Sequence, residues 1–311
     1  MNGIFPINKA AGMTSHDVVA RVRRLARQKS VGHAGTLDPT ATGVLPICLG
    51  QATRVAEYLS ESGKAYRATI RFGVETDTYD TEGNIVAEAP VTLTEREIAD
   101  ALPAFLGEQM QRPPVYSAIK RGGQPVYKLA RAGQMVELEP RPVVIYALRV
   151  VSWDAPDLVL DVECGKGTYI RSLAHDLGAR LGTGAHLAAL TRTRSGPFTL
   201  DHCLTLEALE TALADGGWRE RLYAPDEALL ERRAAILGEH DEARLRNGQP
   251  LRFAPRDPGD ASDGWQPPVD GELLRAYSVD GRFLGILRWN AAGAAWQPHK
   301  VLQVAPVEDA G

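Results

Sequence analysis

The sequence predicts an α+β fold in two parts, and three observations lead to this prediction. Helical and strand-like patterns are mixed along most of the chain, without the regular strand–helix–strand rhythm of a doubly wound sheet. After about residue 230 the pattern changes to short strand-like segments separated by turns. A chain of 311 residues is also long enough for about two ordinary domains. We therefore expect one domain over residues 1–232 and a small β-rich domain over residues 233–311.

The first domain contains both helix and strand patterns. Residues 14–17 (TSHD) fit a capping box, and apolar residues follow at helical spacing from Val18 to Leu25, which predicts a helix over residues 15–28. From Tyr66 to Phe72 every second residue is apolar, which predicts a strand over residues 65–73 with one buried face. Similar patterns predict helices at residues 94–106 and 169–181 and a strand pair at residues 141–152 and 157–164.

The second domain is predicted from shorter signals. A short helix over residues 241–247 is expected to end at Gly248, because glycine commonly follows a helix C-terminus. Residues 255–271 are dense in proline, glycine and aspartate, and we expect a mobile loop there. Strand-like segments follow at residues 273–279, 283–287 and 301–304.

The composition favours a folded protein of the cytoplasm. The hydrophobic fraction of 44% is ordinary for a globular chain. No run reaches the roughly 18 apolar residues that a membrane helix needs, and the first residues show no secretory signal. Cys48, Cys164 and Cys203 are odd in number and far apart, so we expect free thiols and a reducing compartment. No heptad pattern indicates self-association, and we expect a monomer without membrane contact.

The net charge of −4 hides two unlike parts. Residues 1–199 carry 23 Lys and Arg against 20 Asp and Glu, whereas residues 200–311 carry 12 against 19. Basic residues cluster in two places of the first part, and local clusters of this kind matter more for phosphate binding than the total charge. The clusters are Arg21, Arg23, Arg24, Arg27 and Lys29, and Arg112, Lys120, Arg121, Lys128 and Arg131. A solvated helix face is the alternative interpretation of either cluster alone.

Residues 32–43 carry the strongest chemical signal. Glycines, threonines and a proline in this stretch oppose both helix and strand, which predicts a loop that another chain can approach closely. No Gly-Lys-Ser/Thr closes it, so it is not a Walker loop, and His33 and Asp38 have no companion ligands for a metal. Asp38 before Pro39 fits an ordinary turn. It also fits an acid, base or nucleophile presented on a loop beside a basic surface.

This loop is one of five sequence blocks that stand in a recognisable order. The blocks are residues 8–15 (NKAAGMTS), 32–39 (GHAGTLDP) continued by 41–46 (ATGVLP), 64–67 (KAYR) with 73–80 (GVETDTYD), 112–118 (RPPVYSA) and 165–173 (GKGTYIRSL). Together they resemble the TruB family of pseudouridine synthases over residues 4 to about 196. Ala10 departs from the family pattern, which usually has proline there, but no functional group is lost. Residues 246–250 (RNGQP) and 283–286 (FLGI) resemble the PUA-like module of this family.

The resemblance implies both a fold and a reaction. The fold is a mixed, largely antiparallel pseudouridine-synthase sheet with flanking helices, followed by a small β-rich PUA-like RNA-binding domain. The reaction converts the uridine at position 55 in the T loop of tRNA to pseudouridine after the base is flipped out of its stack. The N1–C1′ bond breaks, the base rotates and C5 bonds to C1′. No redox change occurs and no external atom enters, so no cofactor and no metal are expected. The expected partner is tRNA, bound at its T loop and acceptor arm.

The resemblance also assigns roles to individual residues. Asp38 is the expected catalytic carboxylate, Tyr66 stacks on the flipped uracil, and Arg171 pairs with Asp38 and lowers its pKa. The implied substrate-binding residues are His33 in the space left by the base, Leu190 over the base, and Lys9, Lys64, Lys166 and Arg192 on phosphate or sugar. An ionised Asp38 can attack C1′, add to C6 of uracil or abstract the C2′ proton, and these routes remain open. No catalytic role is expected for Asp77 or Asp80.

Three other functions are alternatives to a stand-alone tRNA enzyme. A non-enzymatic RNA-binding or RNA-folding protein could use the same basic surface, although Asp38, Tyr66 and Arg171 together count against binding alone. A guide-RNA-dependent pseudouridine synthase shares the catalytic blocks but works with partner proteins, and no added partner-binding segment is recognisable. A glycoside-processing enzyme leaves the basic helix unexplained. The sequence therefore favours the stand-alone enzyme.

Overall fold

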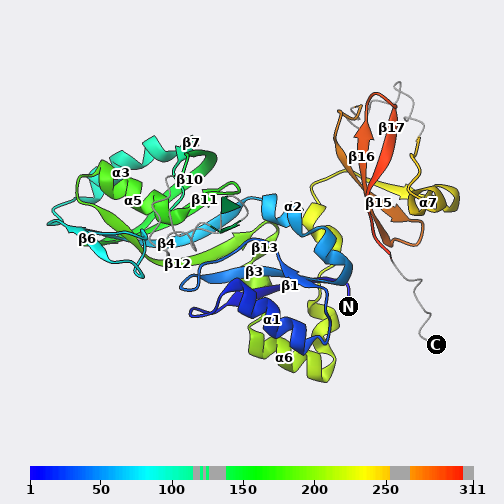
Figure 1. The fold of residues 1–311 in the computed structure, drawn as a ribbon, viewed down its shortest axis with the longest axis horizontal. Helices are drawn as coiled ribbons and strands as arrows, with labels where there is room; N and C mark the ends of the chain where they lie inside the picture. The colour runs from blue at the N-terminus through cyan, green and yellow to red at the C-terminus, as the bar shows by residue number, and fades with distance from the viewer. Residues whose placement is uncertain (115–119, 122–123, 126–137, 253–266, 304–311) are drawn as a thin grey trace.

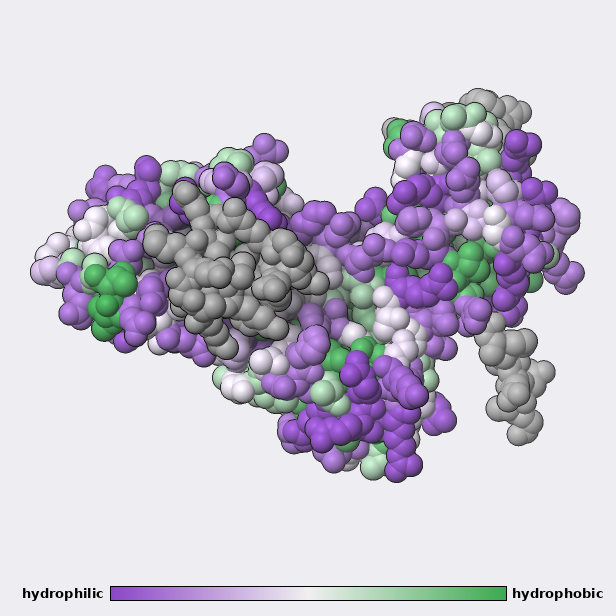
Figure 2. Space-filling view, viewed as in Figure 1, coloured by the Kyte–Doolittle hydropathy of each residue, from purple (hydrophilic) through white to green (hydrophobic). Residues whose placement is uncertain are grey.

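The molecule consists of a larger body around a wide sheet and a smaller, mainly β body at its C-terminal end (Figure 1). This computed structural model describes residues 1–114, 120–121, 124–125, 138–252 and 267–303. Hydrophilic residues make up most of the coloured surface of both bodies in Figure 2. The α+β fold that the sequence predicts is confirmed.

The wide sheet has nine strands and is mixed, largely antiparallel. Its main path runs β1-β3-β12-β4-β11-β10-β7, with β2 paired to β3 and β13 paired to β12. Among the described strands of this sheet only β3 and β12 pair in parallel. The strands are β1 (Gly3–Lys9), β2 (Val31–His33), β3 (Thr42–Leu49), β4 (Lys64–Phe72), β7 (Gly107–Gln111), β10 (Arg141–Asp154), β11 (Asp157–Cys164), β12 (Ala185–Ser195) and β13 (Phe198–Thr199). Two small ladders pair β5 (Val74–Thr76) with β6 (Ile85–Glu88), and β8 (Lys120–Arg121) with β9 (Gln124–Pro125).

Helices lie around this sheet. They are α1 (Ser15–Leu25), α2 (Ala56–Glu61), α3 (Glu95–Ala101), α5 (Ile170–Arg180) and α6 (Leu206–Asp215), with α7 (Glu239–Arg246) in the smaller body. Short 3₁₀ turns are η1 (Gly50–Arg54), η2 (Leu102–Phe105), η3 (Leu200–His202), η4 (Gly217–Arg221) and η5 (Pro225–Leu229). Thr14 caps α1 with Asp17 in the predicted capping box.

The predicted elements of the larger body form, with differences at their ends. Helix α1 ends at Leu25 instead of residue 28, because Arg27 adopts a left-handed φ of 48°. Helix α3 gives way to the tighter turn η2 beyond Ala101, where Pro103 cannot donate a backbone hydrogen bond. In β4 the alternation of buried and exposed residues confirms the predicted half-buried strand.

The smaller body is a four-stranded sheet with α7 beside it. Its strands are β14 (Ala234–Leu237), β15 (Leu273–Ser278), β16 (Phe283–Asn290) and β17 (Ala295–Val301). The predicted strand at residues 301–304 overlaps the observed strand only at Val301, because β17 begins at Ala295, which pairs with Asn290 at the end of β16. The predicted mobile loop at 255–271 lies mostly outside the described residues, as do Lys128 and Arg131 of the second basic cluster.

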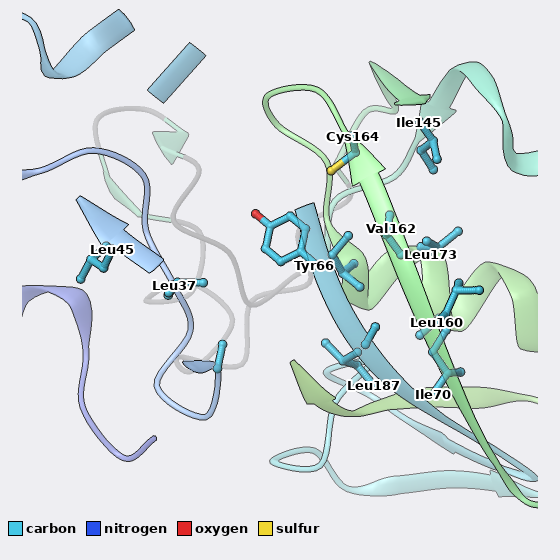
Figure 3. Packing of buried hydrophobic residues seen from close by; sticks show 14 of the residues in the cluster. Leu37, Leu45, Tyr66, Ile70, Ile145, Leu160, Val162, Cys164, Leu173 and Leu187 are labelled. Atoms are coloured by element: carbon cyan, nitrogen blue, oxygen red, sulfur yellow. The ribbon is translucent and has the colours of Figure 1, made fainter. Parts of the chain in front are cut away.

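One hydrophobic cluster connects the two bodies. Phe283, Ile286 and Leu302 of the smaller body belong to the same buried cluster as Val55 and Leu59 at α2. The main core of the larger body packs on the wide sheet, and Figure 3 shows part of it around β4 and β11. Strand β3, which follows the glycine-rich loop, contributes Leu45 and Ile47 to the main core and Val44 and Cys48 to the connecting cluster, so it is packed on both faces.

Candidate active site

The loop that carries Asp38 connects β2 to β3. It is shorter than the predicted residues 32–43, because β2 extends to His33 and β3 already begins at Thr42. The backbone N–H of Ala41 donates to the carbonyl oxygen of Asp38 (3.1 Å). Asp38 therefore stands in a tight turn, and its turn geometry is compatible with a functional role of its side chain.

Two polar side chains bind the backbone of this loop. The Ser15 hydroxyl, at the start of α1, donates to the carbonyl oxygen of Leu37 (3.1 Å) and accepts from its N–H (2.9 Å). Arg192 of β12 is 1% exposed and donates to the carbonyl oxygens of Gly35 (3.0 Å) and Thr36 (3.3 Å). The Arg192 guanidinium thus binds the protein backbone, and we replace its predicted phosphate contact with a role in holding the loop.

Lys9 is held in the same way. It is fully buried at the end of β1, and its ammonium group donates to the carbonyl oxygens of Ala10 (2.9 Å), Met13 (2.6 Å) and Pro39 (3.1 Å). These acceptors use its three protons. Burial also lowers the pKa of Lys9. The predicted contact with phosphate or sugar does not agree with this geometry, and we assign Lys9 to positioning the turn that follows Asp38.

Replacing Lys9 by methionine is expected to destabilise the protein by about 3 kcal/mol, because buried carbonyl groups lose their donor. For a body of this size that corresponds to a fall of roughly 6–12 °C in thermal midpoint, measurable by differential scanning calorimetry. Lys29→Met is the matched control, because Lys29 is exposed. Equal midpoints for the two variants would contradict the positioning role.

Arg171 lies between two carboxylates. Its Nε is 3.0 Å from Oδ2 of Asp38, its Nη2 is 3.2 Å from Oδ1 of Asp38, and its Nη1 is 3.2 Å from Oδ2 of Asp80. The side chains of Arg171 and Asp80 are only 7% and 9% exposed, whereas that of Asp38 is 38% exposed. The buried carboxylate of Asp80 therefore fixes the guanidinium, and the guanidinium orients the half-exposed carboxylate of Asp38 by a two-point contact.

Asp80 has further partners that hold it in place. Its Oδ1 accepts hydrogen bonds from the Thr78 hydroxyl (2.5 Å) and from the backbone N–H of Glu82 (3.0 Å). The sequence did not predict a role for Asp80, although it lies in the block of residues 73–80. Its position in that block was the available signal, but only the structure shows that the turn brings it to Arg171.

Arg171 lowers the pKa of Asp38 as predicted, but burial outweighs this effect and the pKa of the carboxyl is raised overall. Burial in the recess raises the pKa of this carboxyl; the Arg171 guanidinium opposes that effect, and the like charge of Asp80 reinforces it. The sequence indicates the cation beside Asp38, but only the structure shows that the effect of burial is the larger of the two. The resulting group is easier to protonate than an ordinary aspartate.

A cavity of about 270 Å³ opens beside Asp38 and Arg171, close to the lower end of the range for small-ligand sites. Tyr66 of β4 and Leu190 of β12 line it, together with residues 167–171. Tyr66 is 7% exposed, and Figure 3 shows its hydroxyl pointing out of the sheet toward the segment of Leu37. An aromatic face and an aliphatic side chain thus stand beside the carboxylate, as a planar base requires.

The remaining predicted lysines differ in their surroundings. Lys64 lines the cavity but is only 7% exposed, donates to the carbonyl oxygens of Ser60 (2.8 Å) and Ser62 (2.9 Å), and burial lowers its pKa to about 8. The side chain of Lys166 is 64% exposed and pairs with Glu61 (3.0 Å). Of the predicted cationic contacts, Lys166 is thus the most accessible to a large partner.

His33 does not line the cavity. It is half-buried at the end of β2, with its ring edge-on to His16 at 6.2 Å between centroids. Burial lowers the pKa of His33, which favours the neutral imidazole. Its predicted place in the space left by the base would therefore require contact with RNA outside the cavity.

In the part of the chain that the structure describes, no three His, Cys, Asp or Glu side chains are grouped as a metal site needs, and no helix has the length and apolarity to cross a membrane. Cys48, Cys164 and Cys203 are free thiols.

Comparison with known proteins agrees with this geometry. The family model described as TruB family pseudouridylate synthase (N terminal domain) matches residues 23–170, which include Asp38 and Tyr66. The model described as tRNA pseudouridylate synthase B C-terminal domain matches residues 171–232, which begin at Arg171. The chain belongs to the TruB family of pseudouridylate synthases. It is therefore an enzyme that isomerises uridine to pseudouridine in tRNA.

Relatives match this chain over nearly its full length. A protein named tRNA pseudouridine synthase B from Pseudomonas aeruginosa (strain UCBPP-PA14) is 44% identical over 92% of this chain and 91% of its own. One of the same name from Burkholderia mallei (strain NCTC 10247) is 44% identical over 93% of each chain. A chain in a crystal structure of a Cbf5-Nop10-Gar1 complex superimposes with a TM-score of 0.69 and 26% identity, over 92% of this chain and 78% of that chain.

Proposed function

We propose that this enzyme acts on the uridine at position 55 in the T loop of tRNA, with Asp38 as its catalytic carboxylate. The observation that carries the proposal is the two-point contact from buried Arg171 to half-exposed Asp38, at the mouth of a cavity sized for a small group. A stacked base in a tRNA cannot reach Asp38, so the uridine must be flipped out, at a cost of about a few kcal/mol. Tyr66 and Leu190 offset this cost by stacking on and covering the flipped base.

The chemistry that we propose needs no atom from outside the substrate. The N1–C1′ bond breaks, C5 bonds to C1′, the proton leaves C5, and N1 takes up a proton. Asp38 stabilises the sugar by attacking C1′, adds to C6, or removes the C2′ proton. Deuterium at C2′ separates the third route from the other two, because only that route breaks the C2′–H bond. A primary isotope effect on single-turnover rates would assign Asp38 as the base.

We propose that exposed basic residues bind the tRNA backbone near the cavity. On α1 and just beyond it, the side chains of Arg24, Arg27 and Lys29 are exposed. Arg21 lies near Glu207 (3.4 Å) and Glu210 (3.2 Å), so its charge is partly neutralised. Lys166 lies on the segment beside the cavity. Contacts of this kind supply affinity and salt dependence, whereas T-loop shape supplies selectivity.

The test of the substrate is a comparison of tRNA transcripts without any guide RNA. We expect pseudouridine to form in a native transcript and in a T-arm hairpin, and not in a transcript with cytidine at position 55. Mass spectrometry of nuclease fragments after derivatisation of pseudouridine would identify the position. Absence of product in all three, or activity only after guide RNA and partner proteins are added, would refute the stand-alone T-loop enzyme.

The pH dependence of the reaction is expected to report the raised pKa of Asp38. Every proposed route needs the ionised carboxylate, so the single-turnover rate should rise with pH through a pKa above the ordinary value of 3.8. Asp80→Asn removes a like charge and should move this acid limb to lower pH. Quenched-flow measurements between about pH 4 and 8 would check both shifts. A native rate independent of pH in that range would contradict the prediction.

We further propose how the chain is organised around this activity. Residues 1–232 would form the catalytic domain, and residues 233–311 a PUA-like domain that contacts the acceptor arm. A separate sheet and a separate hydrophobic cluster in the smaller body support this division.

We propose that the protein is a monomer in the cytoplasm, in keeping with its three free thiols. Sedimentation velocity would test the monomer. Deleting residues 233–311 would test the acceptor-arm contact: we expect the shortened protein to lose affinity for full tRNA and to keep its affinity for a T-arm hairpin.

A further inference from the structure

Tyr79 adopts an unusual backbone conformation directly beside a buried carboxylate. Its φ is +65°, in the left-handed region that a bulky residue rarely adopts. Its N–H donates to the carbonyl oxygen of Thr76 (3.2 Å), and its own carbonyl oxygen accepts from the N–H of Leu187 in β12 (2.9 Å). The next residue is Asp80, the partner of Arg171. Strained residues of this kind persist where the surrounding structure determines them, and they cluster at functional sites.

The ring of Tyr79 lies flat on the ring of His175. The centroids are 3.9 Å apart and the planes differ by 12°. His175 lies on α5, four residues after Arg171, so the two side chains are neighbours on one side of the helix. Nδ1 of His175 is 3.4 Å from Oε1 of Glu75, on β5. The stack therefore joins the turn that carries Asp80 to the helix that carries Arg171.

We propose that Tyr79 and His175 form a clamp that positions Asp80 against Arg171, and through them orients Asp38. The proposal rests on the catalytic roles proposed above for Asp38 and Arg171. Neither ring lines the cavity, so both are positioning residues.

The geometry explains why a hydrogen bond alone is insufficient. Between Arg171 and Asp80 there is one contact of 3.2 Å, which by itself restrains the distance between the turn and α5 but not their relative orientation. Hydrogen bonds within the turn and from Leu187 hold the turn to β12, not to α5. The stack adds a second connection between the turn and α5, one residue from Asp80. Two connections fix orientation as well as distance. Small displacements of a catalytic group lower the rate steeply, because the reacting atoms must be aligned.

The test uses variants that separate the stack from the backbone turn. Tyr79→Gly removes the ring but adopts a positive φ freely, and His175→Ala removes the other ring. We expect each to lower kcat about tenfold, in line with the strength of aromatic pairs, with KM for tRNA nearly unchanged. His175→Phe keeps a stacking ring and should restore kcat to within about twofold of native. Arg180→Ala, at an exposed position on α5, is the control and should leave kcat unchanged.

A double-mutant cycle tests whether the clamp acts through Asp80. If it does, the kcat of His175→Ala combined with Asp80→Asn should equal that of Asp80→Asn alone. Two results would overturn the clamp while the proposed function stands. One is a double variant in which the kcat losses of the two single variants multiply; the other is a native kcat in both Tyr79→Gly and His175→Ala. An inactive Asp38→Asn beside an active native enzyme is the separate check on the proposed function. If the native enzyme forms no pseudouridine, the clamp and the proposed function fail together.

Discussion

Asp38→Asn is expected to abolish pseudouridine formation, with a loss on the order of 10³-fold or more in kcat. An amide can neither attack C1′ or C6 nor accept the C2′ proton, so the variant fails by all three routes. Its oxygen still accepts a hydrogen bond from Arg171, and Asp80 still pairs with that guanidinium. We therefore expect tRNA affinity and the thermal midpoint to stay close to native. The measurements are product formation by mass spectrometry and tRNA binding by filter retention.

Asp77→Asn is the matched control for Asp38→Asn. Asp77 is exposed, and its carboxylate accepts from the backbone N–H (2.9 Å) and side-chain amide (3.1 Å) of Asn84, away from the cavity. The same loss of charge there should leave turnover within about twofold of native, as surface substitutions usually do. If Asp38→Asn kept more than a tenth of native turnover, Asp38 would not be the catalytic carboxylate.

The fold was predictable where local pattern and burial agree. The capping box of α1, the alternation in β4 and the pair β10–β11 could be predicted because each is set by neighbours in sequence. Strands β3 and β12 could not be predicted in this way. Seven of the eight residues of β3 are buried, starting at Gly43, so it has no alternation. In β12 two irregularities in the pairing with β4 break the alternation. The parallel pairing of β3 with β12 joins Thr42 to Thr191, two residues that are 149 positions apart in the sequence.

The candidate site was predictable in its residues but not in their surroundings. Resemblance indicated Asp38, Tyr66 and Arg171, and the structure brings all three to one cavity. It also indicated Lys9 and Arg192, but as phosphate contacts. A cation in a motif looks the same in sequence whether it faces solvent or a set of backbone carbonyl oxygens. Only the packed structure shows that these two side chains hold the loop.

Arg171→Met is expected to cost both stability and activity. It leaves the carboxylate of Asp80, whose side chain is 9% exposed, buried without its cation. Removing one partner of a buried ion pair costs about 3–5 kcal/mol, or roughly 6–20 °C in thermal midpoint for a body of this size. Activity should fall by at least about 10²-fold, because Asp38 loses its orienting contact. Calorimetry and single-turnover kinetics would measure the two effects.

Combining Arg171→Met with Asp80→Asn separates these two consequences. The double variant no longer buries an unpaired charge, so it should recover much of the lost stability. It should recover no activity, because nothing orients Asp38. Whatever rate remains should also need a higher pH than in the native enzyme. The guanidinium lowers the pKa of Asp38 by more than the Asp80 charge raises it, so losing both charges leaves the pKa higher. If stability and activity recovered together, Arg171 would serve the fold alone, and the orientation of Asp38 would have to come from elsewhere in the loop.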